Sequence, residues 1–350
     1  MKTLSATYLF ALATLTPVLP LLLGALLGGP AVWVGLVTMT LLVSAMDRIV
    51  AAVPTVDQEF PSGETLSLGL FGAHILLLSA AVFGLGHATL TAAEHAGIFA
   101  GVGLWLGQVG NSNAHELIHR PDRLQFRLGR WLFVSLLFGH HTSAHTRVHH
   151  RYVGSDLDPN TARLGESFPA FAIRAWIGSF RSGYTAESAL RRDMPRHRAL
   201  LSNPYVLYCI GALACLGLAF AIGGWAGLLW YVALCGFAQM QLLLSDYVQH
   251  YGLKRREIAP GRLEPVGLAH SWNAPHAWSG ALMLNAPRHS DHHMNPAKPY
   301  PSLELSGALP MLPRALPVMA VIALWPPLWR RVMDRRVAKW AEASRHKTAA

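Results

Sequence analysis

The sequence predicts an all-α integral membrane protein with six membrane-spanning helices and a histidine-rich cap on the cytoplasmic side. Three observations support this fold class. Apolar residues make up 52% of the chain and charged residues only 14%, and several stretches of about 20 residues are long enough to cross a bilayer as helices. Nearly all lysines and arginines lie outside these stretches. Nine of the 18 histidines cluster where the apolar segments end.

Six apolar stretches are interpreted as membrane-spanning helices: residues 7–28, 31–46, 66–90, 93–113, 204–223 and 225–247. The first could be a signal peptide, but its apolar run is long and a second span follows at once, so we expect a membrane anchor. An even number of spans places both termini on the same side of the membrane.

The chain shows no repeat or linker that would mark a second domain, so residues 1–350 are interpreted as one domain with metal-binding segments at 114–203 and 248–313. Residues 154–203 are expected to form a loop with short helices. The apolar run 131–138 is too short to span a membrane and is expected to be re-entrant or interfacial.

Residues 315–329 form another apolar run that is too short to span. It contains three prolines and leads into four arginines, so we expect an interfacial helix over about 315–340.

The basic residues predict the orientation. Thirteen arginines lie between residues 114 and 203, fourteen lysines or arginines follow residue 250, and Lys2 and Arg48 complete the set. With six spans, all of them fall on one side, which is the pattern of cytoplasmic loops. We therefore expect a multi-pass protein of the bacterial inner membrane. Topology also explains the net charge of +10, so we expect no nucleic-acid partner, although a phosphate-binding groove remains an alternative.

The histidine clusters predict a metal site, because neutral imidazole is a good ligand for transition metals and one ligand alone is not enough. Residues four apart share a helix face, so pairs and triplets within a cluster can point at one site. The nine candidate ligands are His115, His119, His145, His149, His150, His250, His289, His292 and His293.

The middle cluster suggests two ions. His145 and His149 share a helix face, whereas His150 lies about 100° away around the axis. His289, His292 and His293 are expected to point at one site. The predicted fourth and sixth spans both end at the cytoplasmic face, where they deliver His115 with His119 and His250. All nine side chains are therefore expected to converge on one layer at the membrane surface.

The chain is expected to hold no flavin or nucleotide of its own. Cys209, Cys215 and Cys235 lie inside predicted spans, where cysteine usually serves as a small packing residue. There is no Cys-x-x-Cys pair for an iron–sulfur centre and no Gly-x-Gly-x-x-Gly fingerprint after a strand. If the metal site performs redox chemistry, its electrons must come from another protein.

The motifs occur in a characteristic order. His-Glu-Leu-Ile-His at 115–119 precedes His-Thr-Arg-Val-His-His at 145–150, and Asp-Tyr-Val-Gln-His-Tyr-Gly at 246–252 precedes Arg-His-Ser-Asp-His-His-Met-Asn-Pro at 288–296. This order resembles the integral-membrane di-iron alkane monooxygenases, a group that includes xylene and cymene methyl hydroxylases and is related to membrane fatty-acid desaturases. Ala144, Asp246 and Gln249 depart from the residues usual in that group.

The resemblance implies two non-haem irons held by the nine histidines and O₂-dependent hydroxylation of a terminal methyl group of a hydrophobic hydrocarbon, such as an n-alkane. It implies electrons from rubredoxin or a ferredoxin-type carrier with an NAD(P)H-dependent reductase, which would meet the basic cytoplasmic face, including Lys254 and Arg255. Carboxylates beside ligands commonly fix the imidazole orientation. The candidates for such supporting roles are Glu116, Asp156, Asp158, Asp246, Asn273 and Asp291.

Four other functions are alternatives. An alkyl-aromatic methyl hydroxylase fits the same motifs. A membrane fatty-acyl desaturase or hydroxylase usually has a second box one residue shorter than the one here. A zinc protease would use Glu116 as its base with two histidines, which leaves seven unexplained. A metal transporter should bury its ligands in mid-bilayer.

Structural or hydrogen-bonding roles are expected for His140, His141, His270 and His276, which lie near the clusters in the sequence but outside their pattern.

Overall fold

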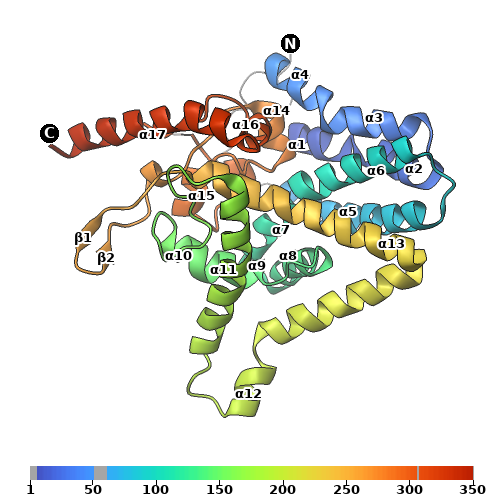
Figure 1. Ribbon diagram of the computed structural model, residues 1–350, viewed down its shortest axis with the longest axis horizontal. Coiled ribbons are helices and arrows are strands. Elements are labelled where there is room, and N and C mark those ends of the chain that lie inside the picture. The colour runs from blue at the N-terminus through green and yellow to red at the C-terminus, as the bar shows by residue number, and fades with distance from the viewer. Residues whose placement is uncertain (1–5, 51–60, 306, 350) are drawn as a thin grey trace.

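The computed structural model describes residues 6–50, 61–305 and 307–349. In these residues the protein is a helical assembly with one short β-hairpin (Figure 1). The first helices are α1 (Ala6–Leu15), α2 (Val18–Leu27), α3 (Pro30–Met39), α4 (Leu41–Ile49), α5 (Pro61–His87) and α6 (Ala92–Trp105). A five-residue π-helix, η1 (Leu106–Gly110), links α6 directly to α7 (Asn111–Ile118).

The middle of the chain carries α8 (Arg123–Ser135), α9 (His141–Ala144), a second π-helix η2 (His145–His149), α10 (His150–Tyr152), α11 (Phe168–Ala189), α12 (Arg196–Leu201) and α13 (Pro204–His250). The hairpin β1 (Glu257–Ala259) and β2 (Arg262–Leu263) follows. The last elements are η3 (Leu268–His270), α14 (Ala277–Leu282), α15 (His289–Met294), η4 (Tyr300–Ser302), α16 (Leu316–Ala323) and α17 (Pro326–Ala349).

The described residues contain three segments long and apolar enough to cross a membrane: Tyr8–Leu27, Gly63–His87 and Pro204–His250. Helices α3 and α4 form a bent pair, at 42°, that makes a fourth if it is one span. The chain is thus a helical membrane protein, as predicted. The predicted span 93–113 differs from an ordinary spanning helix, because α6 passes into the π-helix η1 after 14 residues.

Helix α13 combines the two predicted spans 204–223 and 225–247. It runs for 47 residues and bends at Gly224, where φ is 59° and ψ is −157°. Only glycine adopts such a backbone conformation readily. The bend therefore falls at the residue that separates the two predicted spans.

The polar stretch 154–203 was expected to hold only short helices, and this expectation is wrong. Helix α11 is 22 residues long. Its buried side chains include Phe168, Phe171, Ala172 and Ala175, which recur at helical spacing and pack against α9 and α13. The many polar residues on its other face concealed this apolar stripe.

Most of the apolar run 131–138, apart from the exposed Trp131, is buried inside the protein. Most of it belongs to α8, and Leu132, Phe133, Val134 and Leu136 are fully buried within the protein. The C-terminal run forms the short helix α16, which ends before Pro326, and the longer α17. Trp329 and Met333 of α17 are buried, whereas Arg330 and Arg331 are exposed, so α17 is amphipathic. Its interfacial position stays a prediction.

Glycines allow the apolar helices to approach closely, as is common in membrane proteins. A Cβ atom at Gly84 of α5 would lie only 1.7 Å from the carbonyl oxygen of Ala25 in α2, and one at Gly86 would lie 2.6 Å from the carbonyl oxygen of Gly223 in α13. Figure 1 shows these helices gathered on one side of the molecule, with the hairpin on the opposite side. The histidine-bearing segments lie between them.

We predict that Gly84→Ala destabilises the protein, because α2 and α5 must separate to admit the new methyl group. Overpacking of this kind costs about 1–3 kcal/mol or more. The matched control is Gly69→Ala in the same helix, where a Cβ would meet nothing within 4 Å and alanine favours the helix by about 1 kcal/mol. Thermal unfolding of the purified proteins measures both. Equal unfolding temperatures for the two variants would contradict the proposed close contact.

Candidate metal centre

The structure brings all nine predicted histidines together in two adjacent groups. The nine come from four chain segments: α7 with its C-cap, η2 with α10, the last residue of α13, and α15. Within each group the candidate ligand atoms all lie within 4.8 Å of one another. The first group is His115, His119, His145, His150 and His292, and the second is His149, His250, His289 and His293.

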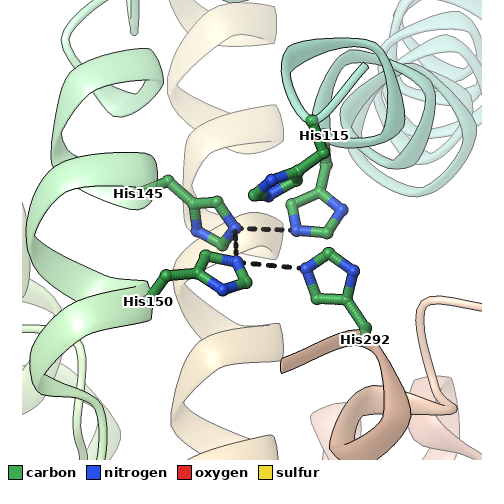
Figure 2. Close-up of side chains that lie close together, drawn as sticks. His115, His145, His150 and His292 are labelled. Carbon is green, nitrogen blue, oxygen red and sulfur yellow. Dashed lines mark hydrogen bonds between the residues drawn. The ribbon is translucent and has the colours of Figure 1, made fainter. Parts of the chain in front are cut away.

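In the first group the imidazoles point at a common centre (Figure 2). Nε2 of His145 lies 2.8 Å from Nε2 of His115 and 3.0 Å from Nε2 of His150. Nε2 of His292 lies 3.1 Å from Nε2 of His150. The Nε2 atom of His119 is buried and has no hydrogen-bond partner among the described residues.

The second group has the same form and lies beside the first. Nε2 of His289 is 3.0 Å from Nε2 of His250 and also 3.0 Å from Nε2 of His293. Nε2 of His149 is buried without a partner in the described part of the chain. The ring of His150, in the first group, is centred 4.6 Å from the ring of His293, in the second.

The structure changes the predicted assignment of the histidines to the two groups. His145 and His149, expected on one face, belong to different groups, while His145 and His150 share one. The reason is η2: a π-helix has i→i+5 hydrogen bonds, so residues five apart align. In α15, His292 joins the first group and His289 and His293 the second. Each of these two segments therefore supplies ligands to both groups.

The spacing of the nitrogens fits metal ions. Two nitrogens each about 2.1 Å from one ion lie about 3.0 Å apart at a right angle and about 3.4 Å apart at a tetrahedral angle. The observed distances of 2.8–3.1 Å match the right angle. All the candidate ligand nitrogens of each group lie within 4.8 Å of one another, so each group could surround one metal ion.

Burial keeps the five imidazoles of the first group neutral, which metal binding requires. Removal from water lowers the pKa of His115 to about 3 and the pKa values of His145, His150 and His292 well below the ordinary range, and the neighbouring histidines lower them further. The lone pairs are thus available at neutral pH without loss of a proton.

His149 is held by Asp158, one of the predicted supporting residues. Nδ1 of His149 lies 2.8 Å from Oδ2 of Asp158. Burial opposes charge on both groups, but their mutual attraction and hydrogen bond raise the pKa of His149 and lower that of Asp158. Thr161 Oγ1 and the backbone N–H of Asn160 also donate to Asp158. The carboxylate therefore accepts from Nδ1–H and leaves Nε2 facing the group.

His250 is oriented by the backbone, since its Nδ1 lies 3.3 Å from the carbonyl oxygen of His270. Asn273 supports α15, because its Oδ1 accepts from the backbone N–H of Ser290 at 2.9 Å. Asp246 is buried and accepts from Asn160 Nδ2 at 2.6 Å.

The remaining predicted carboxylates brace the scaffold rather than an imidazole. Asp291 accepts from Lys298 Nζ and from the backbone N–H of Glu304. Glu116 pairs with Arg120 at 2.9 Å, and burial raises the pKa of Glu116 to about 7 despite that arginine. Asp156 is exposed and pairs with Lys254 at 3.1 Å, so its predicted place beside a ligand is wrong.

An apolar cavity of about 450 Å³ adjoins both groups, with His115, His145 and His289 in its wall. Leu41, Val321 and Leu324 also line it and are exposed on the outer surface. The polar residues of its wall include Gln108, Asn111, Ser112, Gln241, Ser245 and Gln249. The size is typical of small-molecule sites.

Sequence reasoning missed these cavity residues. Gln108 and Asn111 are polar residues inside a predicted span, which is itself a signal of function, but the spans' rotation could not be read from the sequence. His141 was expected to be structural and instead lines the cavity, with its Nδ1 buried and unpartnered among the described residues. His140 and His270 do hydrogen-bond, to Ser179 and Glu264.

Comparison with known proteins identifies the family. The fatty acid desaturase family profile matches residues 89–320, which include all nine histidines. The chain belongs to the fatty acid desaturase family. Within this family it is 34% identical to alkane 1-monooxygenase 2 of Pseudomonas aeruginosa over 240 residues, which are 67% of this chain and 63% of that protein.

Two further relatives of this desaturase-family chain are also named as monooxygenases. It is 30% identical to alkane 1-monooxygenase 2 of Alcanivorax borkumensis over 295 residues, 83% of this chain and 76% of that protein. It is 29% identical to the hydroxylase component of xylene/toluene monooxygenase from Pseudomonas putida over 216 residues, 62% of this chain and 57% of that protein. The resemblance predicted from the histidine motifs is therefore confirmed. The chain spans less than two thirds of the Pseudomonas aeruginosa protein's length.

We predict that Asp158→Asn weakens metal binding about 10–100-fold, the usual effect of losing a partner that orients a metal-bound histidine. The control is Asp156→Asn, the same change two residues earlier at an exposed position. Metal titration of the stripped proteins measures both affinities. Unchanged affinity in Asp158→Asn, or equal loss in both variants, would contradict the role of Asp158.

Proposed function

We propose that this protein is an O₂-dependent hydroxylase of hydrophobic hydrocarbons with a histidine-ligated di-iron centre, which converts a terminal methyl group to a primary alcohol. The observation that carries the proposal is the junction of the apolar cavity with both histidine groups. The similarity to proteins named alkane 1-monooxygenase supports the same reaction class.

The nine histidines would hold two irons, five around one and four around the other. Iron suits an all-imidazole site with open positions, and nitrogens at right angles leave such positions for O₂. When bound, the iron pair would supply the reduction of O₂ and the oxidation of an unactivated C–H bond.

The protein's own contribution is to position the substrate and exclude water. A hydrocarbon would enter from the lipid at Leu41, Val321 and Leu324, where the cavity reaches the exposed apolar surface. Most of the wall is apolar, so a chain inside the cavity meets few polar groups. A substrate that fills the cavity would therefore present one end to the His115, His145 and His289 side of the site.

Electrons would come from rubredoxin or another small carrier, since the sequence holds no flavin, nucleotide or iron–sulfur motif. An acidic carrier would be attracted to exposed arginines such as Arg192 and Arg198. Arg255, predicted to take part in docking, also has a structural role. Its guanidinium donates to the carbonyl oxygens of Glu264 and Arg151, at 2.7 and 3.0 Å, and so ties two loops together.

Product analysis tests the proposal. Purified protein, loaded with iron and supplied with a rubredoxin, its reductase and NADH, would be given n-alkanes of increasing length, p-xylene and a saturated fatty-acyl lipid. We expect alcohols at the terminal carbon, with the oxygen atom derived from O₂. Olefinic lipid as the sole product would favour a desaturase, and benzylic alcohol alone would favour an alkyl-aromatic substrate.

A cavity-filling variant links this activity to the described site. Val43→Trp places a large side chain at the cavity wall and is expected to exclude the longest alkanes that the parent oxidises. The control is Val37→Trp, at a position outside the cavity lining that is 44% exposed. An unchanged chain-length range in Val43→Trp, or the same loss in both variants, would show that the substrate lies elsewhere.

A further inference from the structure

A second cavity, of about 330 Å³, lies between α8, the α9–η2 segment, the end of α11 and the start of α13. It shares no lining residue with the apolar cavity. Its wall is rich in charge and hydroxyl groups, from Arg130, Thr142, Ser143, Thr146, Arg147, Glu187, Arg191 and Tyr208, and is completed by Phe126 and Pro204. Three arginines face one carboxylate, which leaves a net positive charge.

The carboxylate of this cavity, Glu187, already has partners within the protein. Glu187 is 5% exposed and pairs with Arg191 at 2.7 Å and, more loosely, with Arg147 at 3.8 Å. Its Oε1 also accepts a hydrogen bond from Ser143 at 2.8 Å. Glu187 therefore offsets one of the three positive charges and has little capacity left for another donor.

Arg130 is the unmatched arginine. Its side chain is half-buried, and its Nε atom is fully buried with no hydrogen-bond partner among the described residues. Buried donors in native proteins nearly always have an acceptor, and the guanidinium is well matched to phosphate oxygens. The missing acceptor is therefore expected to be an anion within the cavity.

The position of the cavity suits an amphiphilic ligand. Tyr208 lies in the first turns of α13, where the chain enters its long apolar helix, and tyrosine is enriched at that level of a membrane. Beside the cavity, Trp131, Ile210 and Leu213 are exposed apolar side chains on α8 and α13. Basic pockets between membrane helices are known receptors for anionic lipid headgroups.

We propose that this cavity binds a phosphate group, with Arg130 and Arg147 pairing with its oxygens. The phosphate belongs to an anionic phospholipid or to a free phosphate ion. Because Ser143 and Arg147 flank His145 in the chain, the ligand holds in place the segment that carries three of the nine histidines. The proposal does not depend on the reaction proposed above.

Thermal unfolding of the detergent-purified protein, followed by tryptophan fluorescence, tests this site. The probes are a short-chain phosphatidylglycerol, the matching phosphatidylcholine and inorganic phosphate, at constant ionic strength. We expect saturable stabilisation by phosphatidylglycerol and none by phosphatidylcholine, since only a ligand that binds the folded state raises the unfolding temperature. Stabilisation by inorganic phosphate as well would identify the phosphate group alone as the ligand. No stabilisation by either anion, or an equal effect of phosphatidylcholine, would overturn the proposal.

Single substitutions test whether the stabilisation arises from binding in this cavity. Arg130→Gln should weaken the apparent affinity about tenfold, which corresponds to about 1.4 kcal/mol. Arg127→Gln is the control, because Arg127 is an exposed arginine of the same helix outside the cavity lining. Arg147→Gln, at a side chain 54% exposed, provides a second test that does not disturb the buried packing. Unchanged affinity in both cavity variants, or equal loss in Arg127→Gln, would contradict the site.

Discussion

Imidazole nitrogens about 3 Å apart in a buried space attract one another only if one of each pair carries a hydrogen or if a cation lies between them. The described structure contains five such Nε2 pairs, and two further Nε2 atoms are buried without any partner. Buried polar atoms without partners cost about 1–3 kcal/mol each. The surrounding fold must therefore hold the rings in place, and bound cations would turn this cost into a favourable interaction.

Local contacts in the surrounding fold hold the imidazole rings in place. The π-helix η2 aligns His145 with His150 and turns His149 toward the other group. Asp158 fixes the ring of His149, and Asn273 holds the start of α15 through Ser290. Helix α13 delivers His250 at its last residue. The apolar helices beneath, packed through glycines, provide the rigid base for these four segments.

Much of this site could be predicted from the sequence, because metal ligands must be particular residue types in clusters. All nine histidines were identified in that way, and the family resemblance added Asp158 as one of six candidates for a supporting role. The division into groups of five and four could not be, since the sequence does not reveal that residues 145–149 form a π-helix in place of an α-helix. Asp156 and Asp158 illustrate the same limit: two aspartates two residues apart look alike in the sequence, yet one is exposed and the other holds His149.

The cavity and the number of membrane crossings depend on how helices rotate and pack, and composition does not determine this. Gln108 and Asn111 were read as part of an apolar span, and only packing against α13 shows that they face the cavity. Helix α11 was missed because its apolar stripe is diluted by polar residues on the opposite face.

The central claim is that the two histidine groups each hold one iron. Elemental analysis of anaerobically purified protein measures this directly, together with the variants His119→Ala in the first group and His293→Ala in the second. The account predicts two irons per chain in the parent and loss of iron in each variant, with His276→Ala, outside both groups, retaining both. A single zinc per chain in a fully active parent, or full iron content in both His119→Ala and His293→Ala, would contradict it.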